Sequence, residues 1–363
     1  MLVYISDENF NIKYIIDYYK SVIWNSKMYD LSDFEIYLPV IDNSILDVIK
    51  PNFFVWLDVD ITDRRVIENI KINYTITDGY TITISGHDAR TLIKRRIIKY
   101  PIQLPYEVNV SNLAQEAYYN NVLEVNTDQA QDTNRIIDCF YRYSYLDAST
   151  YMYSQFFGEN VFEKIKELEM MDEIGTRTVY TDHKFTLHAI KGIDRTSSQN
   201  TNRRVVFSNE LGNLLEFNIE LDTTEFKNVA YILGEGSGIN RTLAVSGDID
   251  SKGIERYETT VNASELSLNA GTSSAISQEQ YIDILKSAGD QYLTNLNKTY
   301  KFDCKINFDM YKFKTDFDLG DKVEIVTDFK INNSNSVKAR VTEVTESWSD
   351  KGYECLPVLD FNL

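Results

Sequence analysis

Two runs of alternating residues meet at the Asp78-Gly79 pair, and this feature constrains the fold more than any other. Within each run, a polar residue separates the apolar residues, which are Ile70, Ile72, Tyr74 and Ile76, then Tyr80, Ile82 and Ile84. A period of two indicates half-buried strands, and an Asp-Gly pair between two such runs indicates a tight hairpin turn. The segment is therefore predicted to form a long antiparallel hairpin, which commits this part of the chain to a sheet.

The rest of the first hundred residues fits the same sheet. Glu35–Pro39 and Phe53–Asp58 are short strand-like runs, and His87–Ile98 contains a basic stretch that indicates a short helix or a strand end. The chain has 25 Tyr and 18 Phe, and aromatic residues favour the pleated, half-buried surfaces of strands. We expect residues 1–104 to be antiparallel β structure.

The pattern changes to helical spacing in residues 105–215. Ser111 is a candidate cap for a helix that extends to about Val125. In Val161–Met171 the apolar residues recur every three or four positions, which is typical of a helix. Strand-like runs follow at Thr178–Thr181 and Phe185–Ile190. This part of the chain is predicted to be α+β.

Strand patterns dominate again after the polar loop Ser197–Asn202. The predicted strands are Val205–Ser208, Leu214–Leu221, Val229–Leu233, Thr242–Ser246, Arg256–Val261, Lys322–Val326 and Val337–Val341. Asn332–Asn335 is predicted to be a turn. Two β regions are therefore expected, one on each side of the α+β segment.

The strongest helix signal begins at Ser277, after a run at Asn269–Ser277 that is expected to be flexible. Ser277 and Gln280 form a capping box, in which each residue satisfies a backbone N–H of the other. The predicted apolar stripe consists of Tyr281, Leu285, Ala288, Tyr292 and Leu296. A single amphipathic helix of this kind usually covers one face of a domain.

Composition limits the classes of function. The formal net charge is −18, which argues against general or sequence-specific nucleic-acid binding because that needs clustered Lys and Arg. It would suit a surface past which DNA slides without sticking. No apolar run of 18 residues and no signal-peptide pattern are present, so we expect no membrane span and assembly in a cytoplasm.

No residue pattern predicts a catalytic, cofactor or metal site. Cys139, Cys304 and Cys355 are widely spaced and indicate reduced thiols. His87, His183 and His188 are too scattered for a metal site, and the last two are expected on opposite sides of a predicted strand. No nucleophile–base or zinc-protease motif occurs. We therefore expect a protein that is not an enzyme.

Three further patterns invite a functional interpretation, and a structural one is favoured for each. Gly234–Gly238 (GEGSG) lacks the Lys-Ser/Thr ending of a phosphate loop and is expected to be a turn. Lys94-Arg95-Arg96 could contact DNA, but a salt-bridged subunit interface or a solvated strand end is preferred. The pairs Asp58/Asp60 and Asp248/Asp250 could be glycosidase acids, but nothing in the sequence singles them out.

Several segments, in order along nearly the whole chain, resemble the siphovirus Gp37-like (ReqiPepy6-type) tail proteins, which are related to tail hub proteins. The segments are SVIWNSKMYDLSDFEIYLP (21–39), ISGHDARTLIKRRII (84–98), KGIDRT (191–196), VVFSNELGNLLEF (205–217), FKNVAYILGEGSGINR (226–241), GIERYETTV (253–261) and FDLGDKVEIV (317–326). The GHDAR sequence departs from the family's more usual small polar residues, and Asp33 stands where a Gly is frequent.

The resemblance implies a mainly β fold with α+β insertions, in which two antiparallel β-barrel-like domains accompany an α+β domain and a small helical insert. The first barrel is expected at 1–104 and the α+β domain at 105–215. The second, discontinuous barrel is expected at 216–235 with 300–363, and the insert at 236–299. In this arrangement Val229–Leu233 should share a sheet with Lys322–Val326 or Val337–Val341.

The resemblance also implies a function: a structural hub at the tail tip or baseplate of a phage tail or phage-tail-like particle. It implies a homotrimer whose partners are the tail tube or distal tail protein, the tape-measure protein, and tip, spike or fibre-bearing baseplate proteins. Two alternatives from other classes remain open. One is a tail-associated cell-wall hydrolase, which needs an acid–base pair in a cleft, and the other is a carbohydrate-binding receptor module, which needs clustered exposed aromatics.

Overall fold

The chain is mainly β, as expected, with a few helices. A computed structural model describes residues 1–363 except 42–43, 100–101, 124–131, 265, 269–275, 308, 332–333 and 362–363. Residues 332–333 of the predicted turn and residues 269–275 of the predicted flexible run lie outside the described residues, and β20 begins at Ser334. Among the helices that are described, none is long and apolar enough to span a membrane.

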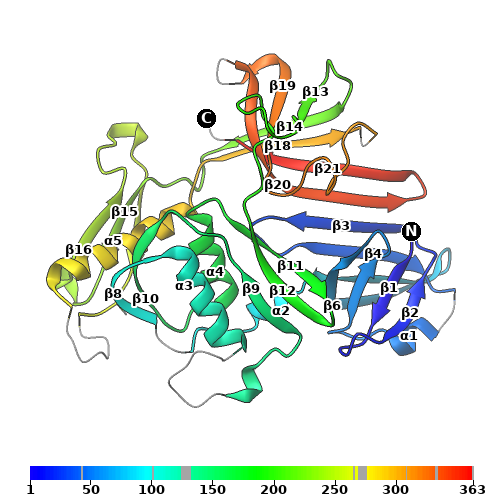
Figure 1. The fold of residues 1–363 in the computed structure, drawn as a ribbon, viewed down its shortest axis with the longest axis horizontal. Coiled ribbons are helices and arrows are strands. Elements are labelled where there is room, and N and C mark those ends of the chain that lie inside the picture. Colours follow the sequence, from blue (N-terminus) through cyan, green and yellow to red (C-terminus); the bar gives the residue numbers. More distant parts are fainter. Residues whose placement is uncertain are drawn as a thin grey trace.

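One large sheet extends across the molecule (Figure 1). Its strands, in order, are β14 (Leu214–Asp222), β18 (Thr299–Ile306), β21 (Gly352–Asp360), β20 (Ser334–Ser349), β3 (Ser21–Lys27), β4 (Asp33–Pro39), β7 (Gly79–Asp88), β6 (Asp60–Thr75), β5 (Phe54–Leu57), β1 (Val3–Ser6) and β2 (Ile12–Ile16). Beside this path, β19 (Lys322–Ile331) pairs with β20 and with β13 (Val206–Ser208).

The predicted hairpin is confirmed as β6–β7. Ile72 lies opposite Ile82 and Tyr74 opposite Tyr80, so the alternating apolar residues share one face. Gly79 has φ +69° at the turn, a left-handed conformation that costs a glycine little. Ile82 and Ile84 are buried, whereas Ile72 and Tyr74, nearer the turn, are exposed.

The prediction of two β-barrel-like domains is wrong for the described residues, because most strands of the two β regions belong to one large open sheet. The two β regions join where β20 pairs with β3, from Glu343 opposite Lys27 to Ser349 opposite Ser21. β20 is 16 residues long, so its first part pairs with β19 while its second part pairs with β3. A strand of this length provides backbone groups for both regions, and neither region closes on itself.

The prediction for Val229–Leu233 is also wrong. This strand, β15, pairs with β16 (Leu243–Gly247) and β17 (Glu258–Asn262) in a separate three-stranded sheet. Its backbone groups are satisfied by the two strands that follow it in the chain, so the C-terminal strands are not needed as partners. The proposed domain boundaries therefore stay predictions, with β15 reassigned to the insert.

Helix α5 (Gln278–Thr294) covers one face of the insert sheet, and its predicted capping box is confirmed. The predicted stripe is only partly right, because Tyr292 is 43% exposed and Leu296 lies beyond the helix. The helix instead approaches the sheet at Gly289, where an added Cβ would lie 2.5 Å from Ile232 Cδ1. The buried face therefore centres on Gly289 rather than on Tyr292.

Two smaller sheets and three helices form the α+β region between the two β regions. The sheets are β8 (Ile102–Asn109) with β10 (Tyr151–Phe156), and β11 (Gly175–Thr181) with β12 (Lys184–Ile190) and β9 (Phe140–Ser144). The helices are α2 (Arg90–Lys94), α3 (Val110–Tyr118), which continues as a π-helix at Tyr119–Leu123, and α4 (Val161–Met170). The remaining elements are α1 (Ser44–Val48) and 3-10 turns at Thr133–Arg135, Gly238–Asn240 and Gly253–Glu255.

The predicted cap of the first helix is wrong by two residues. The cap of α3 is Asn109, whose side chain accepts a hydrogen bond from Ser111 N. Ser111 is already inside the helix, and its hydroxyl donates to the Glu169 carboxyl of α4 at 3.1 Å. The predicted end of this helix near residue 125 lies outside the described residues.

Candidate assembly surfaces

Eight consecutive strands of the main sheet, from β14 to β6, carry one apolar and one polar face. The strand registers place Ile36, Val22, Phe302 and Phe217 on the same face, and most of that face is buried. The opposite face carries mainly hydroxyl, amide and charged side chains. They include Asn69, Asn73, Thr83, Ser85, Tyr37, Ser21, Asn25, Thr345, Ser347 and Asn218.

Carboxylates dominate the charge of this polar face. Its acidic residues are Asp33, Glu35, Glu343, Glu354, Asp360, Asp303, Glu216, Glu220 and Asp222, and its basic residues are Arg340 and the lysines Lys27, Lys71, Lys301 and Lys305. Two of the lysines are ion-paired on the face itself, Lys27 with Asp33 at 2.8 Å and Lys305 with Glu354 at 2.6 Å. The excess of negative charge therefore remains on a surface that spans both β regions.

Arg90 fastens the first β region to the α+β region. Its guanidinium is fully buried and forms an ion pair with Asp88, with 2.7 Å between Nη2 and Oδ2. It also donates to the backbone oxygens of Asp30, at 2.6 Å, and of Thr176 in β11. Burial raises the pKa of Asp88, but the Arg90 charge outweighs it and holds that pKa below its usual value. The GHDAR departure from the family pattern thus supplies a structural ion pair.

Arg65 has a similar role between β6 and the β3–β4 hairpin. It is fully buried, pairs with Asp63, and donates to the backbone oxygen of Asn25 at 2.9 Å. Its guanidinium lies 4.0 Å from the centroid of the Trp24 ring, and Trp24 Nε1 donates to Asp63 at 2.8 Å. Lys314, from the segment before β19, lies 3.5 Å from the same carboxylate and joins the second β region to this cluster.

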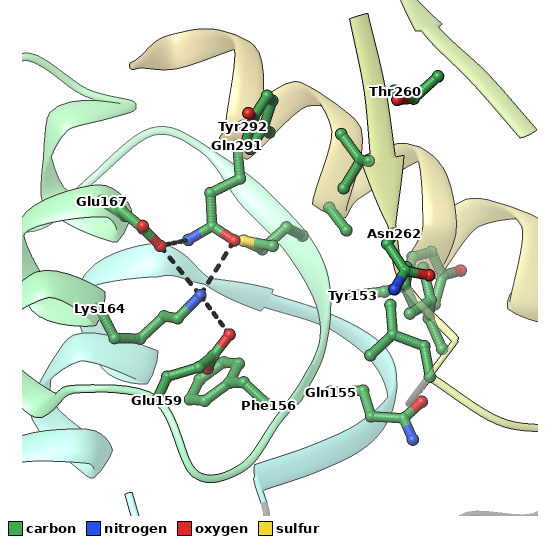
Figure 2. Close-up of a pocket in the computed structure, with 16 residues that line it drawn as sticks. Tyr153, Gln155, Phe156, Glu159, Lys164, Glu167, Thr260, Asn262, Gln291 and Tyr292 are labelled. Carbon is green, nitrogen blue, oxygen red and sulfur yellow. Dashed lines mark hydrogen bonds and ion pairs between the residues drawn. The ribbon is translucent and has the colours of Figure 1, made fainter. Parts of the chain in front are cut away.

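A cavity of about 360 Å³ separates α4 and β10 from the insert. Figure 2 shows Lys164 of α4 at its wall, with the side chains of Glu159, Glu167 and Gln291 pointing toward its ammonium group. Lys164 Nζ lies 3.0 Å from a carboxylate oxygen of each glutamate, and Gln291 of α5 donates to Glu167 at 3.1 Å. This charge network connects α4 with α5 of the insert. The wall of the cavity is therefore a contact between two parts of the same chain.

The three histidines lie apart, and no cluster of metal-ligating side chains occurs in the described part of the chain. His87 Nδ1 lies 2.5 Å from the Glu68 carboxylate at the surface. His183 is in the β11–β12 turn with φ +60°, not in the strand that His188 occupies. The expectation that the two side chains lie on opposite sides of one strand is therefore wrong, because only His188 is in the strand.

The basic and glycine-rich motifs have structural partners. Lys94 pairs with Glu163 and Arg95 with Glu68, while Arg96 donates to the Arg135 backbone oxygen. The partners of this run belong to the same chain, so the expectation of a salt-bridged subunit interface stays a prediction. The Gly234–Gly238 segment connects β15 to β16 as a turn, and the Arg241 guanidinium donates to its first carbonyl at 2.7 Å.

The acidic pairs and the cysteines have distinct surroundings. Asp60 forms an ion pair with Lys314 at 2.6 Å, and Asp58 follows the end of β5. Asp248 and Asp250 lie in the exposed loop after β16.

All three cysteines are free thiols, and burial raises the pKa of Cys139 to about 11 and of Cys355 to about 12. These thiols are protonated at neutral pH and are poor nucleophiles.

The buried arginines were missed in the sequence. Arg65 interrupts a strand pattern and Arg90 follows an Asp by two residues, but a buried arginine looks like a surface arginine in a single sequence. No signal in the sequence separates Arg65 and Arg90 from exposed arginines.

A family model described as "Siphovirus ReqiPepy6 Gp37-like protein" matches residues 2–359. The chain belongs to this family. The predicted resemblance is confirmed, and it identifies the chain as a phage tail protein. Among curated proteins, no match was found.

Solved phage tail proteins share the fold of this Gp37-like protein. A prophage tail protein gp18 from Listeria monocytogenes EGD-e matches with a TM-score of 0.55 and 10% identity, covering 99% of this chain and 94% of the other. The 43 kDa tail protein of prophage MuSo2 from Shewanella oneidensis gives 0.54 and 11%, with 99% and 98% covered. A tail protein from Neisseria meningitidis MC58 gives 0.52 and 11%, with 99% and 96% covered.

Proposed function

We propose that this Gp37-like protein is the structural hub at the distal end of a phage tail or phage-tail-like particle, where a ring of three copies joins the tail tube to the tip. The observation that carries the proposal is the run of eight antiparallel strands with one buried face and one polar face. A sheet of this kind can line a passage with its polar face while the α+β region and the insert lie outside it. Family membership supports a tail location.

The acidic polar face fits a channel wall. Nucleic acid binds proteins mainly through cationic side chains, so a wall with excess carboxylates has little affinity for a passing DNA strand. The partners of the ring are the tail tube or distal tail protein above, the tape-measure protein, and tip, spike or fibre-bearing baseplate proteins below. Assembly takes place in the bacterial cytoplasm, before the particle is released.

The position and copy number of the protein test this proposal. Immunogold labelling of intact tails should place the protein at the distal end only. Quantitative mass spectrometry of the same particles should give three copies for each tail. Labelling along the whole tube, or at the head-proximal end, would overturn the proposal.

We also propose that the protein has no catalytic activity. Asp60 of the first acidic pair is neutralised by Lys314, and the second pair lies in an exposed loop rather than across a cleft. A glycosidase needs two carboxyl groups that face each other across a bound sugar. Zymography with purified protein on host cell walls should show no clearing, and clearing that disappears in one Asp or Glu variant would establish a hydrolase.

A further inference from the structure

The charge network between α4 and α5 brings an amine, an amide and a carboxylate into mutual contact. Lys164 Nζ lies 3.4 Å from Oε1 of the Gln291 side chain, and Gln291 Nε2 donates to Glu167 Oε2 at 3.1 Å. The same oxygen of Glu167 lies 3.0 Å from Lys164 Nζ. As Figure 2 shows, these three side chains converge on one another, so a single carboxylate oxygen contacts both nitrogen atoms.

The two nitrogen-bearing side chains are held in place by their helices and shielded from water. Lys164 is only 6% and Gln291 only 8% exposed. The ring of Phe156 lies 5.4 Å from the ammonium group, and the close approach of α5 to the insert sheet at Gly289 fixes the helical turn that carries Gln291. Groups that are held this close react as if their concentrations were very high, because little entropy is lost when they meet.

Burial also bears on the charge of the pair formed by Lys164 and Glu167. An ammonium and a carboxylate that leave water both lose hydration, and transfer of one proton across their hydrogen bond converts them into a neutral amine and a carboxylic acid. A neutral amine is a nucleophile, and a carboxylic acid that contacts an amide nitrogen is a general acid. The three side chains therefore provide a nucleophile, an electrophilic carbonyl carbon and a group that transfers protons.

We propose that Lys164 and Gln291 join in an intramolecular isopeptide bond, which forms without any other reactant. Glu167 takes a proton from Lys164 Nζ, and the amine then attacks Cδ of Gln291. The Nζ–Cδ bond forms, the Cδ–Nε2 bond breaks, and Glu167 returns its proton to the leaving nitrogen. One ammonium ion is released for each lysine ammonium group consumed, so atoms and charge balance, and nothing is oxidised or reduced.

The surroundings suit both the leaving group and the product. The cavity of about 360 Å³ is lined by Lys164 and Gln291, and it provides space for the departing ammonia. Glu167 accepts a hydrogen bond from the N–H of the new secondary amide. The second carboxylate beside Lys164 belongs to Glu159, whose side chain is 44% exposed, so it stays hydrated when the positive charge is lost.

The bond fastens the insert to the α+β region covalently. It closes a loop between residues 164 and 291, and a crosslink over so long a segment stabilises the fold mainly by restricting the unfolded chain. Each chain reacts once and acts on no external substrate, so the bond is consistent with a protein that has no enzymatic turnover.

Mass spectrometry of the purified full-length chain tests the proposal. The denatured protein should be lighter than the mass calculated from its sequence by one ammonia. After digestion with trypsin, residues 143–166 and 287–298 should appear as one joined peptide, because trypsin does not cut after a lysine whose amine is acylated. A chain with the full calculated mass would overturn the proposal.

Three variants identify the reacting groups. Lys164→Arg keeps the positive charge but has no amine, and Gln291→Met has no carbonyl carbon, so both should have the full calculated mass. Glu167→Gln cannot take up the proton and should slow formation of the crosslink by about 100-fold. Lys166→Arg is the matched control, because Lys166 lies on the same helix but pairs with Asp30, and this variant should lose ammonia as the wild type does.

The joined peptide distinguishes this bond from other losses of ammonia. A succinimide at an asparagine gives the same change in mass but leaves residues 143–166 and 287–298 in separate peptides, and that result would refute the isopeptide bond. A crosslink that forms at the wild-type rate in Glu167→Gln would refute the role of that carboxylate. The position and copy number of the protein in the tail are measured separately, so neither result bears on the proposed hub.

Discussion

Each half of the eight-stranded run has four antiparallel strands, but the surroundings of the buried and half-buried carboxyl groups differ between the halves. In β3, β4, β7 and β6, the carboxylates of Asp63 and Asp88 are paired with Arg65 and Arg90. In β20, β21, β18 and β14, Asp360 is half-buried and its Oδ1 has no hydrogen-bond partner in the described structure. The difference shows that one sheet can contain both stabilising and destabilising charges.

The pKa values of these groups follow their surroundings. Burial alone would raise the pKa of Asp63, but the charges of Arg65 and Lys314 hold it below its usual value. Burial raises the pKa of Asp360 to about 6, because its neighbouring charges do not compensate. The first half therefore favours neutral pH, where its carboxylates are ionised, and Asp360 favours acidic pH, where it is protonated.

The largest effect is expected from removing the buried cation of the first half. Arg90→Met leaves Asp88 buried without its partner, and we expect the free energy of unfolding to fall by about 3–5 kcal/mol. Arg340→Met in the second half is the comparison, since Arg340 donates to the backbone oxygens of Lys191 and Gly320 and its ion-pair partner, Glu173, is largely exposed. It should cost about 2 kcal/mol. Denaturant unfolding measures both, and equal losses would remove the contrast between the halves.

A smaller effect of opposite sign is expected from Asp360→Asn. The native pKa is raised, so the wild-type carboxyl contributes stability below about pH 4 and loses it as the pH rises through about 6. The asparagine variant should therefore be about 2–3 kcal/mol more stable than wild type at pH 8 and indistinguishable from it at pH 4. Thermal unfolding at both pH values tests the sign. A variant that is less stable at pH 8 would contradict the account of Asp360.

The smallest effects are expected at the hairpin turns of the two halves. Gly79 has φ +69° and Gly352 has φ +107°, and an added Cβ would meet nothing within 4 Å at either position. The cost of alanine is then conformational strain alone, about 1 kcal/mol for Gly79→Ala and about 2 kcal/mol for Gly352→Ala, which lies farther from the left-handed helical region. Urea unfolding of the two variants should give this order. The reverse order would contradict the view that backbone strain alone determines the loss of stability.

The sequence predicted individual hairpins and helix caps better than it predicted which distant strands pair with each other. The Asp78-Gly79 hairpin and the Ser277 capping box depend on a few adjacent residues, and both are confirmed. Val229–Leu233 pairs with the two strands that follow it rather than with the C-terminal strands, and the alternating pattern alone does not distinguish between these partners. The joint between β20 and β3 was missed for the same reason, since it connects residues more than 300 positions apart.

The candidate surfaces were only partly visible in the sequence. The exposed positions of Ile72 and Tyr74 look identical to core positions, because alternation describes a face and does not say what covers it. The net charge suits a surface past which DNA slides without sticking, but only the strand registers show which side chains share the polar face. Arg65 and Arg90 could be found only from the structure, since burial of an arginine depends on the partners that surround it.

The orientation of the main sheet in an assembled tail tests the central claim most directly. A cryo-electron microscopy reconstruction of the distal tail should show three copies of this protein, with the polar face of β14 to β6 lining the central channel and the α+β region outside it. A reconstruction in which that polar face points away from the channel, or in which the protein forms a six-membered ring, would contradict the account.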